Sequence, residues 1–566
     1  MRTINVRQDK TLPVKIVVIL IILVIAGSVL AGVLRSVIPS SEMADLSVYY
    51  QASDGTAALT ANGVMSSSRC LWQDGEPYLL YSIVKSELND KFYWDQTEQL
   101  LLYTTPVEVI QSDASSVYQE HPVFLTKTDT SGTQQVYLSL NYISQYTNIT
   151  VDSFSGPNRV FIRSSWGITR TASVPSGTAL RTEAAVSSAI LCKTTSAEQL
   201  RILSSENGWS RVYSARGYVG YVRDSELKGI TETADSGPYQ APEYTTLAGG
   251  QKVCLVWHQV FHESGVDSLP GLLASTSGVT VVCPTWFSIV DNQGTIESRA
   301  NKQYVTIAHS RGLSVWGLLE NINSDVKLDN YTILSATSHR KAMISKLISE
   351  AQAVGLDGIN VDLEGLPESA GNAYIEFIRE LSVACRTNGL MLSVDNYVPS
   401  AWTRFYNRDK QAEVADYIVI MNYDEHYKGS EAGSTASLSF VQKGIENTLA
   451  EVPASKVINA LAFYTRLWKG DTDTPESETC SMAQAKAFVD AHATAANQMS
   501  WLVDEGQYYF EVELSDGLYR IWLENKESIE AKLTVMSQYS LAGVGCWKLG
   551  METSDVWSSI AAYLAK

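Results

Sequence analysis

Three polar side chains alternate with apolar ones in the segment 356–366, LDGINVDLEGL. Asn360, Asp362 and Glu364 stand at every second position, with one apolar residue between each pair. Because side chains of a β-strand alternate between its two faces, all three polar groups are expected on one face. Strands of a buried parallel sheet are normally apolar throughout, and a buried carboxylate is unfavourable unless a partner or a function compensates for it. The segment therefore predicts a functional site.

The spacing of the two carboxylates predicts acid–base chemistry. Asp362 and Glu364 are two residues apart, which is roughly 6.6 Å along a strand. At that separation the carboxylates interact, and one pKa rises. A glutamic acid with a raised pKa can act as a general acid near neutral pH. The alternative for an isolated pair is a solvated acidic loop, but the apolar residues between the acids argue against it.

Residues 357–364, DGINVDLE, resemble the DxxDxDxE signature of glycoside hydrolase family 18, which includes chitinases and endo-N-acetylglucosaminidases. Asn360 stands where chitinases usually have Asp, and this resembles the bacterial spore-cortex and cell-wall branch. The resemblance implies substrate-assisted retaining catalysis, in which the acetamido oxygen of the substrate is the nucleophile. Glu364 would protonate the leaving oxygen and then activate water. Asp362 would stabilise the oxazolinium ion, and Asp357 would support Asp362 from the start of the strand.

Two later segments resemble further motifs of the same family. DYIVIMNYD at 416–424 is similar to its MxYD segment, which implies that Tyr423 binds the acetamido carbonyl, Met421 shapes the pocket and Asp424 contacts the sugar. LAGVGCWKLG at 541–550 supplies Trp547, which resembles the tryptophan of the pocket floor and could stack on a sugar ring. Asn360 is expected with these substrate-binding residues. The resemblance implies no metal and no organic cofactor.

Strand and helix patterns alternate through residues 250–566. This alternation predicts an α/β fold of the TIM (β/α)8 type, with its chemistry at the carboxyl ends of the strands. Apolar residues at helical spacing predict helices over 341–353 and 374–385. A gap at about 468–540 predicts a small α+β insertion that contains a hairpin of 508–514 and 519–523. The eight expected strands are 252–256, 279–283, 313–318, 358–363, 390–394, 417–421, 457–463 and 543–547.

Two further regions are expected before the barrel. Residues 36–166 contain a weak internal repeat, in which 77–104 and 136–164 each follow the order strand, short helix, hairpin. They resemble the copper amine oxidase N-terminal-like domain, and we expect an α+β stalk without copper. Residues 172–230 resemble the bacterial Src-homology-3-like domain, a small β-barrel that would either bind peptidoglycan or act as a spacer. Residues 231–249, rich in Pro and Gly, predict a linker.

The N-terminal segment predicts a membrane attachment. Residues 16–34 form an uncharged run of apolar and small residues, long enough for a tilted transmembrane helix. Residues 1–15 carry four basic side chains and one acidic one, which predicts a cytoplasmic tail and an extracellular catalytic domain. The alternative is a cleaved signal peptide.

Composition argues against a nucleic-acid-binding protein and against a protein with a cysteine-based zinc site. The formal net charge of −18 argues against nucleic-acid binding, which depends on clustered basic residues. The 7 cysteines are scattered singly, with no zinc-binding spacing, and are expected to be buried thiols.

The sequence thus predicts a membrane-anchored glycosidase that cleaves β-linked, N-acetylglucosamine-containing glycan, with peptidoglycan as the expected substrate. A chitinase and a catalytically silent glycan-binding protein are the alternatives. The presence of Glu364 argues against the silent protein.

Overall fold

The chain forms two compact units. The structure is a computed structural model that describes residues 16–19, 21–22, 24–26, 38–195, 198–262 and 264–565. One unit comprises the chain up to Asp90 together with Ala114–Ala241, and the other comprises Lys91–Asp113 together with Pro242–Lys566. Much of the predicted transmembrane segment 16–34 lies outside the described residues. Among the residues that are described, no helix is both long and apolar enough to cross a membrane.

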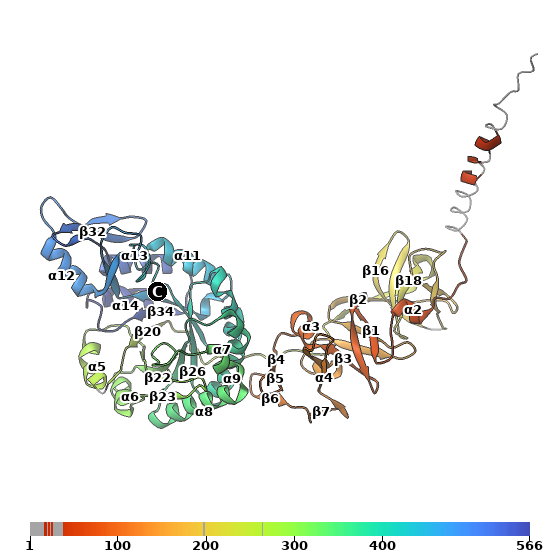
Figure 1. Ribbon diagram of the computed structural model, residues 1–566, viewed down its shortest axis with the longest axis horizontal. Helices are drawn as coiled ribbons and strands as arrows, with labels where there is room; N and C mark the ends of the chain where they lie inside the picture. The colour runs from red at the N-terminus through yellow and green to blue at the C-terminus, as the bar shows by residue number, and fades with distance from the viewer. Residues whose placement is uncertain are drawn as a thin grey trace, which may run out of the picture. The chain divides into compact units, whose positions relative to one another are not determined.

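Eight parallel strands close into a barrel in the second unit (Figure 1). Each strand pairs with the next along the chain, and the β20–β34 pairing closes the ring. All eight predicted strands are confirmed, and the fold is the predicted TIM barrel. The strands are β20 (Val253–His258), β21 (Val281–Pro284), β24 (Ser314–Glu320), β25 (Gly358–Asp362), β26 (Met391–Tyr397), β27 (Tyr417–Met421), β28 (Val457–Ala462) and β34 (Gly543–Trp547).

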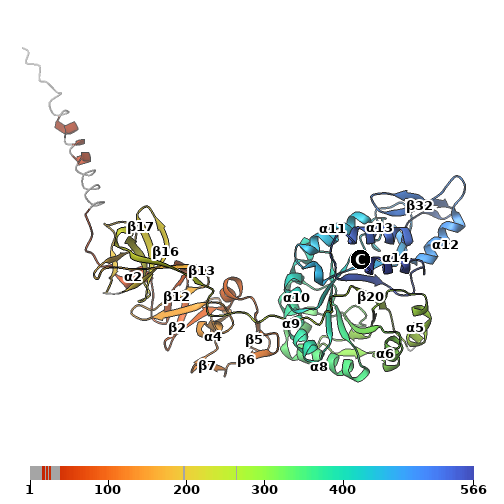
Figure 2. The ribbon, with the colours of Figure 1, turned by 180° about the vertical axis from the view of Figure 1, so that it is seen from behind.

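Helices cover the outside of the barrel, as Figure 2 shows from behind. Their apolar faces join the outward-facing strand residues in one large core, because each amphipathic helix must bury its apolar side. The predicted helices 341–353 and 374–385 are confirmed within α8 and α9. The outer helices are α5 (Ser264–Ala274), α6 (Lys302–His309), α7 (Asn330–Ser335), α8 (Thr337–Val354), α9 (Gly371–Thr387), α10 (Arg408–Val414), α11 (Leu438–Leu449), α13 (Lys526–Met536) and α14 (Val556–Leu564).

The predicted α+β insertion before the last barrel strand is present as a five-stranded antiparallel sheet. Its hairpin pairs β32 with β33 as predicted. The insertion begins at Tyr464 rather than near 468, because β28 ends at Ala462 and the chain enters the new sheet almost at once. Its elements are β29 (Tyr464–Lys469), β30 (Glu476–Ser481), α12 (Met482–His492), β31 (Ser500–Leu502), β32 (Gln507–Leu514) and β33 (Gly517–Leu523).

A three-stranded meander from the expected stalk belongs to the barrel unit. It consists of β4 (Phe92–Asp95), β5 (Leu100–Thr104) and β6 (Val109–Ser112). We call residues 91–113 the meander. The predicted order of strand, short helix and hairpin is present in both copies of the internal repeat. The hairpin of the first copy packs on α9 of the barrel, however, so the barrel unit is discontinuous in sequence.

The first unit contains two seven-stranded sheets. The second sheet includes β13 (Gly167–Ser173) and β19 (Lys228–Asp235), which pair along most of their length. The predicted linker 231–249 therefore starts inside a strand, and the chain leaves regular structure only after Asp235. The resemblances of this unit to amine oxidase-like and Src-homology-3-like domains stay predictions. All 7 cysteines are free and buried, as expected.

Candidate active site

The carboxyl end of β25 presents the predicted acid, Glu364. Its backbone is fixed by the side-chain amide of Asn321, which accepts from the Glu364 N–H and donates to the Glu364 carbonyl, both at 2.8 Å. Its carboxylate Oε2 accepts from the hydroxyl of Tyr397 at 2.8 Å. Tyr397 is the last residue of the neighbouring strand β26, so two adjacent strands hold the acid from both sides. The side chain stays partly exposed.

Burial and nearby acids keep Glu364 protonated to a higher pH than an ordinary glutamate. Loss of hydration raises its pKa, the charges of Asp424 and Glu320 raise it further, and the hydrogen bond from Tyr397 opposes them. The pKa of Asp362 is raised well above its ordinary range, first by burial and then by the neighbouring Asp395 and Glu364. The predicted interaction between the two carboxylates is therefore present.

Tyr423, Met421 and Asp424 lie together where β27 ends. Burial, followed by the neighbouring Tyr464 and Asp362, raises the pKa of Tyr423 well above its ordinary value, so its phenol is neutral and can donate a hydrogen bond. Asp424 is exposed and accepts from the hydroxyl of Tyr464 at 2.6 Å. Met421 is half-buried and pairs with Tyr397 of β26, next to the acid.

Trp547 is the last residue of β34, the last barrel strand. Its ring lies 5.8 Å from that of Trp257, at an angle of 58°, and it remains partly exposed. A tryptophan fixed in this way at the strand ends can present an apolar surface to a sugar ring.

Asp357 does not lie with the other predicted catalytic residues. It precedes β25, and its Oδ2 accepts from the backbone N–H of Val315 at 2.7 Å and lies 2.8 Å from Nε2 of His309. Asp362 follows five positions later along the extended strand, about 16 Å away. Asp357 and Asp362 thus lie toward opposite ends of the strand, and the support of Asp362 by Asp357 stays a prediction.

Asn360 is not placed to bind substrate. It is fully buried, and its amide group donates to Ser393 at 2.8 Å and to Asp395 at 2.7 Å while accepting from the indole of Trp257 at 3.1 Å. Asn360 lies two residues before Asp362 on the same face of β25, which places its side chain inside the barrel. The predicted contact with sugar is replaced by a hydrogen-bond network that supports the site from below.

Sequence reasoning missed Asp395, Tyr397, Glu320 and Asn321. Asp395 and Tyr397 alternate at the end of β26 in SVDNY, the same period-two signal that identified Asp362 and Glu364. Glu320 ends β24, is buried, and accepts from the hydroxyl of Ser288. A search for polar residues at every predicted strand end would have found three of the four.

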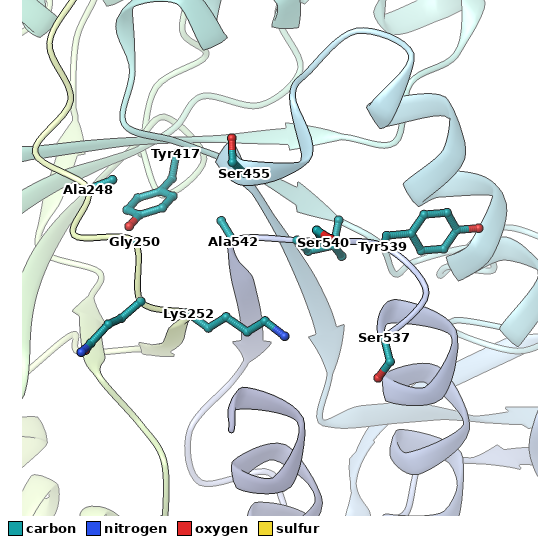
Figure 3. Close-up of a pocket in the computed structure, with 11 residues that line it drawn as sticks. Ala248, Gly250, Lys252, Tyr417, Ser455, Ser537, Tyr539, Ser540 and Ala542 are labelled. Atoms are coloured by element: carbon teal, nitrogen blue, oxygen red, sulfur yellow. The ribbon is translucent and has the colours of Figure 1, made fainter. Parts of the chain in front are cut away.

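A pocket of about 400 Å³ lies at the other end of the barrel (Figure 3). Its lining includes Lys252, Tyr417 and Ala542, which precede or begin β20, β27 and β34. In TIM barrels the amino ends of the strands contribute to stability, whereas the carboxyl ends carry the chemistry. This pocket is therefore separate from the candidate active site.

Comparison with known proteins identifies the family. Residues 259–552, more than half of the chain, match the model of glycosyl hydrolases family 18. The chain belongs to glycosyl hydrolase family 18. It is therefore a glycosidase of this family, and its matched region contains every residue of the candidate site described above except Trp257.

Relatives of this family 18 glycosidase include bacterial and mammalian enzymes. It is 24% identical over 281 residues to the uncharacterized glycosylase YvbX of Bacillus subtilis, covering 48% of this chain and 80% of YvbX. It is 21% identical over 260 residues to the cortical fragment-lytic enzyme of Bacillus subtilis, covering 44% of this chain and 60% of the relative. It is 24% identical over 322 residues to di-N-acetylchitobiase of Mus musculus, covering 49% of this chain and 85% of the relative.

Two solved structures share the barrel fold of this family 18 glycosidase. A chitinase from Chromobacterium violaceum aligns with a TM-score of 0.50 and 22% identity, covering 56% of this chain and 99% of that structure. The spore cortex-lytic enzyme SleL of Bacillus cereus aligns with a TM-score of 0.50 and 17% identity, covering 59% of this chain and 77% of that structure. At these identities the likeness establishes the fold.

Proposed function

We propose that this protein hydrolyses β-linked, N-acetylglucosamine-containing glycan of the bacterial cell wall by substrate-assisted retaining catalysis. The observation that carries the proposal is the unequal exposure of the two acids. Glu364 is partly exposed at the strand end, whereas Asp362 is only 6% exposed. Of these two acids only Glu364 is placed to reach a glycosidic oxygen, which supports a nucleophile supplied by the substrate, as in the substrate-assisted exception to the two-carboxylate mechanisms.

Each side chain then has one task. Glu364, protonated because of its raised pKa, gives its proton to the leaving oxygen and afterwards takes a proton from water. Asp362 faces the acetamido group and stabilises positive charge on it, while the neutral phenol of Tyr423 donates to the acetamido oxygen. Trp547 supports the sugar ring from beneath. Relatives named as cortical fragment-lytic enzymes support a wall glycan as the substrate.

Chitin is the second candidate substrate, favoured by the similarity to di-N-acetylchitobiase, which covers 85% of that enzyme. The two substrates share the N-acetylglucosamine residue that the site would bind. Product analysis therefore has to separate them.

The test uses residues 36–566 with purified sacculi and, separately, with chitin, followed by mass spectrometry of the released fragments. We expect soluble fragments from sacculi with N-acetylglucosamine at the new reducing end. Glu364→Gln should lower the rate by about 10²- to 10⁴-fold, the usual contribution of general acid catalysis. Glu368→Gln, which changes an exposed glutamate four residues later, is the matched control and should keep full activity.

Three outcomes would contradict parts of the proposal. Turnover by Glu364→Gln within a few fold of wild type would exclude the assigned acid. Products from chitin with none from sacculi would make the protein a chitinase. Glycan binding without products from either polymer would indicate the silent glycan-binding protein.

We also propose that residues 16–34 anchor the enzyme in the cell membrane with the barrel outside. The uncharged run and the basic residues before it support this proposal. Full-length protein should remain in the membrane fraction after a salt wash and keep its original N-terminus. A soluble form that begins near Ala31 would indicate a cleaved signal peptide instead.

A further inference from the structure

Asp395 and Asp362 are neighbours inside the barrel. In the parallel pairing of β25 with β26, Asn360 lies opposite Ser393 and Val361 opposite Val394, and Asp362 and Asp395 are the next residues of the two strands. Asn360 donates to both Ser393 and Asp395, which shows that the inward side chains of the two strands meet on one side. Neighbouring strands lie about 4.8 Å apart, so the two carboxyl groups adjoin. Asp362 is 6% exposed and Asp395 only 2% exposed.

No positive charge faces this pair within the described part of the chain. Neither aspartate takes part in an ion pair there. Two adjoining buried carboxylates cannot both ionise without a cation, since each charge opposes the other. The titratable groups whose charges act on the pair, or which the pair acts on, are Glu320 of β24, Glu364 after β25, Cys283 of β21, Tyr423 after β27, Tyr374 of α9 and Tyr406.

The hydrogen bonds of the two aspartates are unequal. Asp395 accepts from the amide of Asn360, which stabilises its ionised form. Oδ1 of Asp362 is buried and has no hydrogen-bond partner among the described residues. Burial raises the pKa of Asp395 to about 8, and burial and Asp395 raise that of Asp362 well above its ordinary range. In the free enzyme the pair therefore carries a proton at neutral pH, and the bonds favour Asp362 as its site.

We propose that Asp395 is a positioning residue for Asp362 and that the two carboxyl groups share one proton during the reaction. The proton lies on Asp362 in the free enzyme and moves to Asp395 when positive charge develops on the substrate acetamido group. One O–H bond breaks at Asp362 and one forms at Asp395, so no other reactant is needed. Asp362 is then a carboxylate next to the oxazolinium ion that it stabilises. This inference rests on the proposed function and extends it to a residue outside the DxxDxDxE segment.

The test substitutes Asp395→Asn, which keeps an oxygen acceptor for Asn360 but cannot take up a proton. We expect kcat to fall at least tenfold while KM changes less than threefold. The apparent pKa that the pair contributes to the pH–rate profile should fall by at least one pH unit. The reason is that Asp395→Asn removes the charge of Asp395, which raises the pKa of Asp362. Asp416→Asn is the matched control.

Asp416 is a buried aspartate of the same barrel that holds the backbone N–H groups of Leu392 and Leu247 at the other end of the strands. Its substitution should lower stability without moving the pH profile. If Asp395→Asn keeps the wild-type profile and a kcat within twofold, the inference is wrong although the proposed function stands.

A second measurement does not depend on activity. Carbon-13 NMR of the aspartate carboxyl groups should show, in the free enzyme, a carboxyl that titrates near pH 8 and disappears in Asp395→Asn. An unchanged titration would overturn the shared proton. Absence of hydrolysis by the wild type would overturn the proposed function alone, because this titration would still report on the pair.

Discussion

The meander supplies the missing N-cap of helix α8, and removal of this cap should lower the stability of the barrel. The residue before α8, Ala336, has no side chain that can cap the helix. Asp95 of β4 replaces that cap, since its Oδ2 accepts from the backbone N–H and the hydroxyl of Thr337, both at 2.6 Å. Its Oδ1 accepts from the N–H groups of Thr97 and Glu98 at 2.9 Å. Asp95 is fully buried. Asp95→Ala therefore removes four hydrogen bonds at once.

The expected loss of stability follows from these contacts. Removal of a helix N-cap typically costs about 1–2 kcal/mol. A buried donor that loses its acceptor adds about 1–3 kcal/mol. Because the four bonds share one carboxylate, these contributions overlap, and we expect the free energy of unfolding of the barrel to fall by about 3 kcal/mol in total, or roughly a hundredfold in the folding equilibrium.

Urea unfolding of residues 36–566, followed by tryptophan fluorescence, measures this loss. Hydrogen exchange should also speed up in the first turn of α8, from Thr337 to Arg340, before the rest of the helix. Asp129→Ala is the matched control, because Asp129 organises its own turn through Ser131 and Thr133 but is exposed and lies in the other unit. A change below about 1 kcal/mol with unaltered exchange in α8 would refute the capping role.

Three further predictions concern the site. Tyr397→Phe removes the donor that lowers the pKa of Glu364; the alkaline limb of the pH–rate profile should therefore move to higher pH, with a loss of about tenfold or more in kcat. Trp402, in the 3-10 helix η4 (Ala401–Tyr406) after β26, is 88% exposed, so Trp402→Ala should leave the melting temperature unchanged but raise KM for polymeric glycan about tenfold, as expected for a lost sugar–aromatic contact. The buried pair of Asp362 and Asp395 has raised pKa values, so the folded state holds a proton on the pair that the unfolded chain releases. The resulting stabilisation is complete below about pH 4 and is lost as the pH rises toward 8, with a slope of up to about 1.4 kcal/mol per pH unit per proton. Urea midpoints between pH 5 and 9 should show this decline, and Asp395→Asn should reduce it.

The sequence by itself determined the barrel and the position of Glu364 beside Asp362. Strand periodicity and length depend on local residue order, so the eight strands could be located without the structure. The alternation of Asp362 and Glu364 with apolar residues also fixes which face they share. Their place at a carboxyl end then follows from the rule for parallel barrels.

Only the tertiary structure decided which other residues join that acid. Asp357 belongs to the same motif as Asp362 but lies about 16 Å away, because the two residues stand five positions apart along an extended strand. Asp395 lies outside the motif yet adjoins Asp362, since parallel pairing brings distant strands into register. The meander contacts the first turn of α8 from more than two hundred residues away, through the buried carboxylate of Asp95 and the side chain of Glu98. Contacts of this kind depend on packing between elements, which no local pattern of residues encodes.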